Sequence, residues 1–149
     1  ACRAASSTAV RLPSGPMAPD GRRDGNAETR AAAERRGRRA EAWAAWLLRA
    51  KGYRILSRRY RTPAGEIDLI ARRGRQIVFV EVKQRPDAAT AIAAVTPQGR
   101  RRIARAAAVW VSHHPAAAAF DRRFDVIVAL PRRLPRHLVA VFDDAGEMW

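Results

Sequence analysis

Three charged residues interrupt the most apolar part of this sequence, and their spacing suits metal binding. Glu81 and Lys83 end the apolar run that begins at Ile77, and Asp68 interrupts the apolar run before it. Side chains two residues apart in a strand point the same way, so Glu81 and Lys83 share a face. Charges at the end of a buried strand are costly unless they are paired or used. Because hard divalent cations prefer carboxylate oxygens, the cluster is a candidate Mg²⁺ or Mn²⁺ site.

The separation of Asp68 from Glu81 depends on the turn between their strands. We expect these strands over residues 66–72 and 76–83, joined by a turn that contains a glycine. A two-residue turn would place Asp68 diagonal to Glu81, and a four-residue loop would place the two residues directly opposite. Opposed Cβ atoms lie about 4.5–5.5 Å apart and diagonal ones roughly 7–8 Å apart. Both registers therefore bring the carboxylates together.

Lysine is rare in this chain, which makes its presence at position 83 informative. Of 29 Lys and Arg residues, only Lys51 and Lys83 are lysine. Arginine stays protonated, whereas burial can lower the pKa of a lysine and let it accept a proton from water. Lysine at position 83 is therefore suited to taking a proton from water.

The motif of Asp68 followed by Glu81-Val82-Lys83 resembles the D-(x)n-ExK signature of the restriction-endonuclease-like, or PD-(D/E)xK, nuclease superfamily. The longer series GEIDLIA, VFVEVKQR and RFDV resembles the small uncharacterised bacterial family typified by YraN, from about Arg35 to the C-terminus. This resemblance implies metal-dependent cleavage of DNA phosphodiesters. It implies that Asp68, Glu81 and the Val82 carbonyl bind Mg²⁺ or Mn²⁺, and that Lys83 acts on the water. Glu66 and Glu41 are further candidates for the site.

Two positions depart from the family pattern. Gly99 stands where the family usually has a lysine, and Arg59 lies near its asparagine. The alternative to an enzyme is therefore a non-catalytic nucleic-acid-binding protein that retains the nuclease fold. Glu41 also has two interpretations, a carboxylate near the metal or a solvated helix glutamate paired with Arg38 or Arg49.

The charge of the chain points to an anionic partner. The net charge is +15 and the isoelectric point is near 11.7, which favours nucleic acid. The family resemblance implies DNA in preference to RNA. The other interpretation is that the high arginine content reflects a GC-rich coding sequence. Two clusters of arginines are candidates for phosphate contact. The first consists of Arg58, Arg59 and Arg61, and the second of Arg100, Arg101, Arg102 and Arg105. For the second cluster, the alternative is a solvated helix face.

The sequence excludes several other classes of protein and site. Cys2 is the only cysteine, which excludes an internal disulfide and a thiolate metal cluster. No apolar run approaches the ~20 residues of a membrane span, and the N-terminus has no uninterrupted apolar secretion segment. We expect a cytoplasmic protein that does not bind membranes. We expect His113, His114 and His137 to be surface residues, since no further ligands are spaced for a zinc site.

The predicted elements follow the order αβββαββ, a restriction-endonuclease-like α/β core with a mixed sheet flanked by helices. The helices are expected over residues 27–50 and from Pro97, capped by Thr96, to near His113. The remaining strands are expected over residues 53–60, 123–130 and 138–142, and a loop over 84–95. In the first helix the apolar stripe falls on Trp43, Trp46, Leu47 and Ala50.

Asp125 lies inside a predicted strand. We expect it to form a salt bridge with Arg122, Arg123 or the arginines of the second helix, and a metal role is the minor alternative.

The N-terminal stretch differs in composition from the rest of the chain. Residues 1–26 are rich in Pro and Gly and are predicted to be disordered, which leaves residues 27–149 as one endonuclease-like domain. Met17 stands just before the domain, and we hypothesise that the residues ahead of it are an upstream extension or the product of a misplaced start codon.

Overall fold

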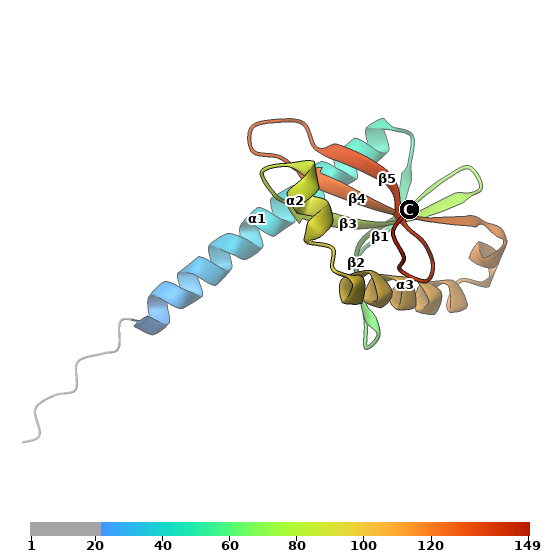
Figure 1. The fold of residues 1–149 in the computed structure, drawn as a ribbon, viewed down its shortest axis with the longest axis horizontal. Helices are drawn as coiled ribbons and strands as arrows, with labels where there is room; N and C mark the ends of the chain where they lie inside the picture. The colour runs from blue at the N-terminus through green and yellow to red at the C-terminus, as the bar shows by residue number, and fades with distance from the viewer. Residues whose placement is uncertain (1–21) are drawn as a thin grey trace, which may run out of the picture.

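The computed structural model describes the backbone of residues 22–149, and the side chains from residue 28 onward. The first helix, α1 (Arg22–Ala50), projects well beyond the sheet (Figure 1). It begins ahead of the predicted start, so residues 22–26 are helical instead of disordered. The rest of the stretch predicted to be disordered, with Met17, lies outside the described residues.

The chain after α1 forms one sheet and its connecting helices. The strands are β1 (Arg54–Thr62), β2 (Gly65–Arg73), β3 (Gln76–Gln84), β4 (Asp121–Ala129) and β5 (Arg136–Phe142). Between β3 and β4 lie α2 (Ala88–Ala93), α3 (Pro97–Ser112) and the short 3-10 helix η1 (Pro115–Ala119). The predicted order is confirmed with one correction. The loop predicted over residues 84–95 contains α2, whose N-cap Asp87 accepts a hydrogen bond from the Thr90 amide.

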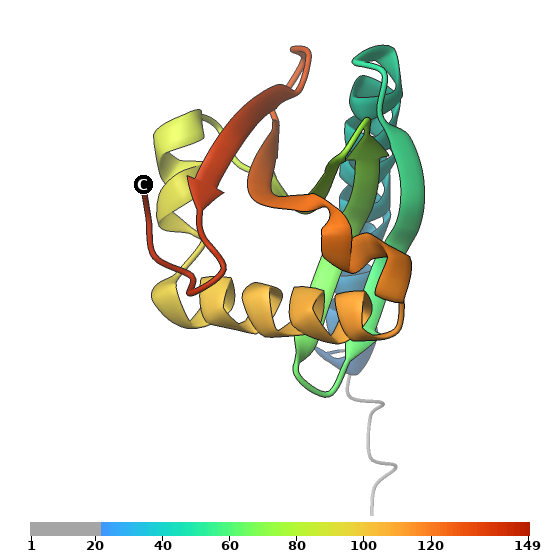
Figure 2. The same cartoon turned by 90° about the vertical axis from the view of Figure 1, so that its right-hand side faces the viewer.

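The sheet is mixed, as predicted. Its strands lie in the order β1-β2-β3-β4-β5, and every neighbouring pair is antiparallel except β3 and β4, which are parallel. A parallel pair needs a crossover connection, which α2 and α3 provide. One core cluster packs α3 against the sheet and the other packs α1 against its other face. The helices therefore cover both faces (Figures 1 and 2).

The ends of the helices follow the predicted sequence signals. Thr96 caps α3 by accepting a hydrogen bond from the Gly99 amide, Pro97 is its first residue, and the C-cap is His113. Gly52 follows α1 with φ of 83°, the left-handed conformation that favours glycine after a helix.

The buried side of α1 differs from the predicted stripe. Trp43 and Trp46 are 54% and 50% exposed, so the prediction that they form the apolar packing stripe is wrong. Small residues make the contact with the sheet. From residue 28 onward, the buried residues of this helix are Ala40, Ala44, Ala45, Leu48 and the polar Glu41. Because alanine lets a helix backbone come close to a sheet, the large indoles remain on the outer side.

A buried polar cluster joins β4 and β5. Asp125 is fully buried, and its carboxylate accepts two hydrogen bonds from Arg123, both 2.8 Å, and one from the Ala140 amide at 2.9 Å. The predicted salt bridge is thus confirmed for Arg123. His137 Nε2 lies 2.7 Å from Asp125 Oδ2, and the His137 side chain is only 1% exposed, so its predicted surface position is wrong. His113 and His114 are exposed, as predicted.

No helix within residues 22–149 has the length and apolar content needed to cross a membrane.

Candidate active site

The pairing of β2 with β3 places Asp68 opposite Glu81. Arg73 pairs with Gln76 and Leu69 with Val80, around a two-residue turn at Gly74-Arg75. One step further in this register, Asp68 faces Glu81, which is the directly opposed arrangement among the two predicted. The turn itself is shorter than the loop expected for that arrangement.

Asp68 stands where the two strands part. The β2–β3 ladder ends at the pair of Leu69 with Val80, and beyond it the Val82 amide donates to Asp68 Oδ2 at 2.7 Å. A carboxylate oxygen thus takes the place of a backbone carbonyl as acceptor. On its other edge β3 stays paired with β4 as far as Gln84 and Ala129. The backbone of β3 is therefore held firmly at the point where β2 leaves it.

Glu81 and Lys83 form an ion pair beside Asp68. Lys83 Nζ donates to Glu81 Oε1 at 2.5 Å, and the two side chains are 25% and 16% exposed, respectively. Burial and the nearby charge of Asp68 raise the pKa of Glu81 to about 7, although Lys83 acts in the opposite direction. Burial also raises the pKa of Asp68, against the Val82 hydrogen bond and the charge of Lys83. One lysine does not neutralise this pair of carboxylates.

The carboxylates open onto a pocket of about 350 Å³ between the sheet and the start of α3. Its lining consists of Glu66, Asp68, Glu81, Gly99, Arg102 and Ile103. A close approach at Gly65 lets α3 reach this position, because a Cβ there would stand 2.4 Å from the Arg102 carbonyl oxygen. The pocket therefore places a guanidinium-bearing residue, Arg102, with the acidic residues.

Glu66 lies at the edge of this pocket. It is 42% exposed and forms an ion pair with Arg61, 3.1 Å between Nε and Oε1. Glu66 thus lines the site but already has a cationic partner, in contrast to Asp68.

Glu41 reaches the same region from α1. It is 7% exposed and lies 3.5 Å from Arg59 Nε, and burial raises its pKa while Arg59 lowers it and Asp68 raises it. The alternative of a solvated glutamate paired with Arg38 or Arg49 is wrong, because Glu41 is buried and its ion pair is with Arg59. The structure thus brings Glu41 close enough to Asp68 for their charges to interact.

Arg59 has an unusual backbone and an unsatisfied side-chain atom. Its φ of 51° lies in the left-handed region, which asparagine tolerates better than most residues. The asparagine expected near this position from the family resemblance fits that conformation. The Nε of Arg59 is buried and has no hydrogen-bond partner. Sequence reasoning identified Arg59 as a departure and did not foresee that it would face Glu41.

The predicted phosphate-binding arginines divide into two groups. Arg58, Arg61, Arg101, Arg102 and Arg105 are exposed, and Arg59 is half-buried. Arg100 instead donates to the carbonyls of Gly146 at 2.7 Å and Val95 at 2.9 Å. Arg100 therefore anchors the C-terminal segment, and the pocket-lining member of this cluster is Arg102.

The donor atoms fit a small hard cation. Among residues 28–149 no group of three or more His, Cys, Asp or Glu side chains is arranged to hold a metal ion. Mg²⁺ is usually bound by one or two carboxylates and completes its shell with water and substrate phosphate. Asp68 and Glu81 match that donor set, and burial raises the pKa of both carboxyl groups.

The sequence is similar to a family found in several bacteria. Residues 40–129 match the pattern of the uncharacterised protein family UPF0102. A UPF0102 protein of Bradyrhizobium sp. strain BTAi1 is 52% identical over 136 residues, which cover 91% of this chain and 93% of the relative. A UPF0102 protein of Parvibaculum lavamentivorans is 52% identical over 82% of this chain and 92% of its own length. One from Agrobacterium fabrum is 50% identical over 80% and 98%.

Proposed function

The chain belongs to the uncharacterised protein family UPF0102, as the resemblance in its sequence indicated, and we propose that it is a metal-dependent endonuclease acting on DNA phosphodiesters in the cytoplasm. One observation supports this above all. Asp68 and Glu81 face each other where β2 and β3 part, and Lys83 holds Glu81 at the edge of a pocket that also contains Arg102. Acidic oxygens, a lysine and an arginine in one open pocket suit the hydrolysis of a phosphate ester.

The roles of the residues follow from their positions. Asp68 and Glu81, with the Val82 carbonyl, would hold Mg²⁺ or Mn²⁺, which when bound polarises the phosphate and neutralises charge at the scissile bond. The Val82 amide fixes Asp68, so this carboxylate does not have to be ordered when substrate arrives. Lys83 would orient or deprotonate the attacking water. Arg102 would bind a phosphate oxygen of the substrate strand.

The second candidate is a DNA-binding protein without catalytic activity. Gly99 favours it, because the residue lines the pocket at the place where the resemblance leads us to expect a lysine, and it supplies no charge. The half-buried Arg59 also favours it, because its guanidinium already lies beside Glu41 and lowers the need for another cation there.

The decisive experiment is a cleavage assay with flap, junction, nicked, single-stranded and linear duplex DNA in Mn²⁺, Mg²⁺ or EDTA. We expect cleavage of at least one substrate that needs metal and is lost in Asp68→Asn and Glu81→Gln. Glu34→Gln is the matched control, since Glu34 is an exposed glutamate that pairs with Arg38 away from the pocket. If no substrate is cut although the protein binds DNA, the non-catalytic candidate is the correct one.

Phosphate contact is tested separately by salt dependence. Each phosphate neutralised contributes about −0.9 to the slope of log K against log salt for duplex DNA. Replacing Arg101, Arg102 and Arg105 with alanine should flatten the slope by up to roughly three units and leave sequence preference unchanged. An unaltered slope would remove α3 from the DNA interface.

A further inference from the structure

A second surface on the protein combines exposed indoles with unpaired arginines. Trp43 and Trp46 lie on the outer side of α1 with ring centroids 5.7 Å apart and ring planes at 80°. Their edges form a right-angled apolar recess of about 450 Å³, completed by Arg39 and Ala42. Two adjacent exposed indoles make a contiguous apolar patch, and such patches often mark a binding site, because burying an indole removes a large apolar area from water.

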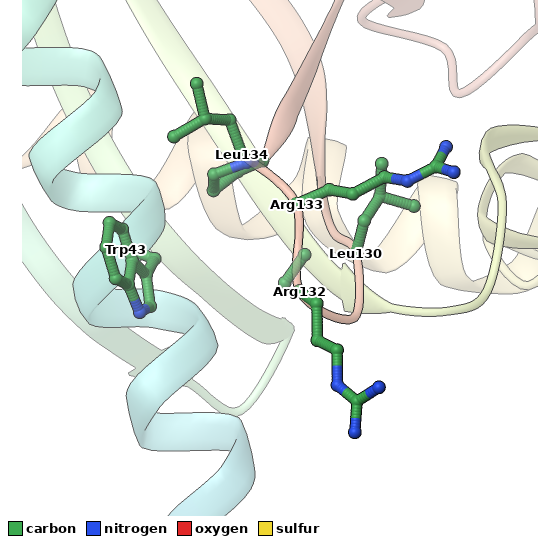
Figure 3. Close-up of a pocket in the computed structure, with 7 residues that line it drawn as sticks. Trp43, Leu130, Arg132, Arg133 and Leu134 are labelled. Atoms are coloured by element: carbon green, nitrogen blue, oxygen red, sulfur yellow. The ribbon is translucent and has the colours of Figure 1, made fainter.

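Trp43 also forms a wall of a second recess, of about 410 Å³, against the loop between β4 and β5. Figure 3 shows the indole facing this loop, with Leu130 and Leu134 across from it, while the guanidinium groups of Arg132 and Arg133 extend away from the apolar centre. One tryptophan thus separates two adjacent apolar recesses.

The rim of both recesses is cationic. Arg39, Arg132 and Arg133 are exposed, and no carboxylate within residues 28–149 pairs with any of them. Arg132 is also held at φ of 54°, a strained conformation for a long side chain. Aromatic rings surrounded by uncompensated arginines suit a ligand that has flat apolar groups and regularly spaced negative charges. Unpaired nucleotides have both, and every base offers a face for stacking.

The position of this surface relates it to the candidate active site. Gln84 pairs with Ala129, so the loop that carries Arg132 and Arg133 begins where β3 ends, directly after Lys83. Helix α1 carries Glu41 on its buried side, close enough to Asp68 for their charges to interact, and Trp43 on its outer side against this loop. A strand that leaves the pocket past the end of β3 would reach this loop, and Trp43 lies against the loop.

We propose that Trp43 and Trp46, with Arg39, Arg132 and Arg133, bind a single-stranded segment of nucleic acid next to the site of cleavage. The inference rests on the proposed function for its relation to cleavage, but the binding surface itself does not require catalysis. The substrate would accordingly be DNA with an unpaired segment beside the cut bond, such as a flap or an overhang, instead of a continuous duplex.

The test measures binding of a fluorescein-labelled oligo(dT) by fluorescence anisotropy, in EDTA so that no cleavage occurs. Stacking on an aromatic side chain contributes an amount equivalent to roughly 5- to 150-fold in affinity per base. Trp43→Ala and Trp46→Ala should each weaken oligo(dT) binding by a factor in that range, while Trp43→Phe should retain most of it. Binding to a continuous duplex of the same length should change less than twofold.

Controls separate the possible outcomes. Trp149→Ala removes another exposed indole, 83% exposed at the C-terminus, and should leave oligo(dT) binding unchanged. Equal binding by the parent and Trp43→Ala would overturn the inference, and cleavage of duplex substrates would then still support the proposed function. If Trp43→Ala instead converts a dimer to a monomer with unaltered oligo(dT) binding, the surface joins two copies of the chain and the inference is wrong. Absence of any nucleic-acid binding would contradict both proposals.

Discussion

Two buried acidic regions lie on neighbouring strands of the sheet and are stabilised in opposite ways. Asp125 on β4 pairs with Val80, one residue before Glu81 on β3. Burial alone would raise the pKa of Asp125, but hydrogen bonds from His137, Arg123 and the Ala140 amide hold it below its usual range. On β3, burial and the charge of Asp68 raise the pKa of Glu81 to about 7.

This difference in pKa distinguishes the structural carboxylate of Asp125 from the carboxylates of the candidate site, Asp68 and Glu81. Every oxygen of Asp125 is bound by donors from the protein, so its charge contributes to the stability of the fold. Asp68 and Glu81 receive the Val82 amide and Lys83, which leaves their combined charge incompletely balanced. A carboxylate pair that the protein leaves in excess is suited to an external cation.

The largest expected effect is the loss of activity on replacing Lys83. The size of this loss shows whether Lys83 reacts with water or only supplies a positive charge. If Lys83 takes a proton from water, Lys83→Arg should lose activity almost as fully as Lys83→Ala, because arginine does not deprotonate. A positioned general base contributes about 10²–10⁴-fold, which is the loss we expect in kcat for both variants. DNA binding should persist in both.

A Lys83→Arg protein with the turnover of the parent would restrict Lys83 to holding Glu81 by charge. Lys83 would then be only an ionic partner of Glu81, as Arg123 is of Asp125.

Next in size is the loss of stability on removing Asp125. Asp125→Ala leaves the guanidinium of Arg123 without its buried partner and should reduce the free energy of unfolding by about 3–5 kcal/mol. Asp68→Ala should cost far less, because it relieves repulsion with Glu81. Urea denaturation of the two variants measures the contrast directly, and similar losses would show that both carboxylates are structural.

A smaller effect on stability, a gain instead of a loss, is expected when Glu81 is replaced. Its folded-state pKa near 7 exceeds the ordinary value of 4.5, so the native protein holds a proton that the unfolded chain releases between these values. Stability of the metal-free parent should therefore fall as pH rises from about 4.5 to 7. Glu81→Gln removes this dependence and should be more stable than the parent at pH 8, by about 1–3 kcal/mol.

Asp125 supplies the contrasting pH dependence. Its pKa is lowered in the folded state, so its stabilising contribution is complete above the unfolded value of about 3.8 and is lost as pH falls below it. Denaturation profiles of Glu81→Gln and the parent between pH 3 and 8 would resolve the two windows. A parent profile that rises from pH 4.5 to 7 would contradict the assignment of Glu81.

The smallest effect is stabilisation by metal without substrate. Mg²⁺ gives up its waters reluctantly and expects phosphate oxygens, so binding should be weak. At about ten times the dissociation constant, the gain in stability is ~1.4 kcal/mol. Thermal melts should show a rise in Tm with Mg²⁺ or Mn²⁺ in the parent and none in the Asp68→Asn, Glu81→Gln double variant. Equal shifts in both would place the cation elsewhere.

The local sequence was sufficient for the strands that carry the site. Apolar runs around a glycine turn predicted β2 and β3, and the period of two predicted that Glu81 and Lys83 share a face. Whether Asp68 lies opposite or diagonal to Glu81 depends on the register of the turn, which the sequence left open and the structure fixes. The helix caps at Thr96 and Gly52 also follow from local chemistry.

Features that depend on tertiary packing were not predictable in this way. A helix with alanines at 40, 44 and 45 and tryptophans at 43 and 46 has two possible packing sides, and the sheet selects the small one. The alanine spacing was a signal for this choice, but the large indoles outweighed it in the sequence analysis. The burial of His137 depends on Asp125, a partner on another strand that no local pattern reveals.

The cluster around Asp125 also has a consequence for the order in which the chain folds. It joins Arg123 to Tyr53, 70 positions away, and His137 to Lys51, 86 positions away. The β1–β2–β3 meander, by contrast, closes through short turns and forms without waiting for distant segments. During synthesis, we therefore expect Asp68, Glu81 and Lys83 to come into register before β4 and β5 have left the ribosome. The long-range cluster closes last, and until then β3 presents an unpaired apolar edge that exposes the nascent chain to aggregation.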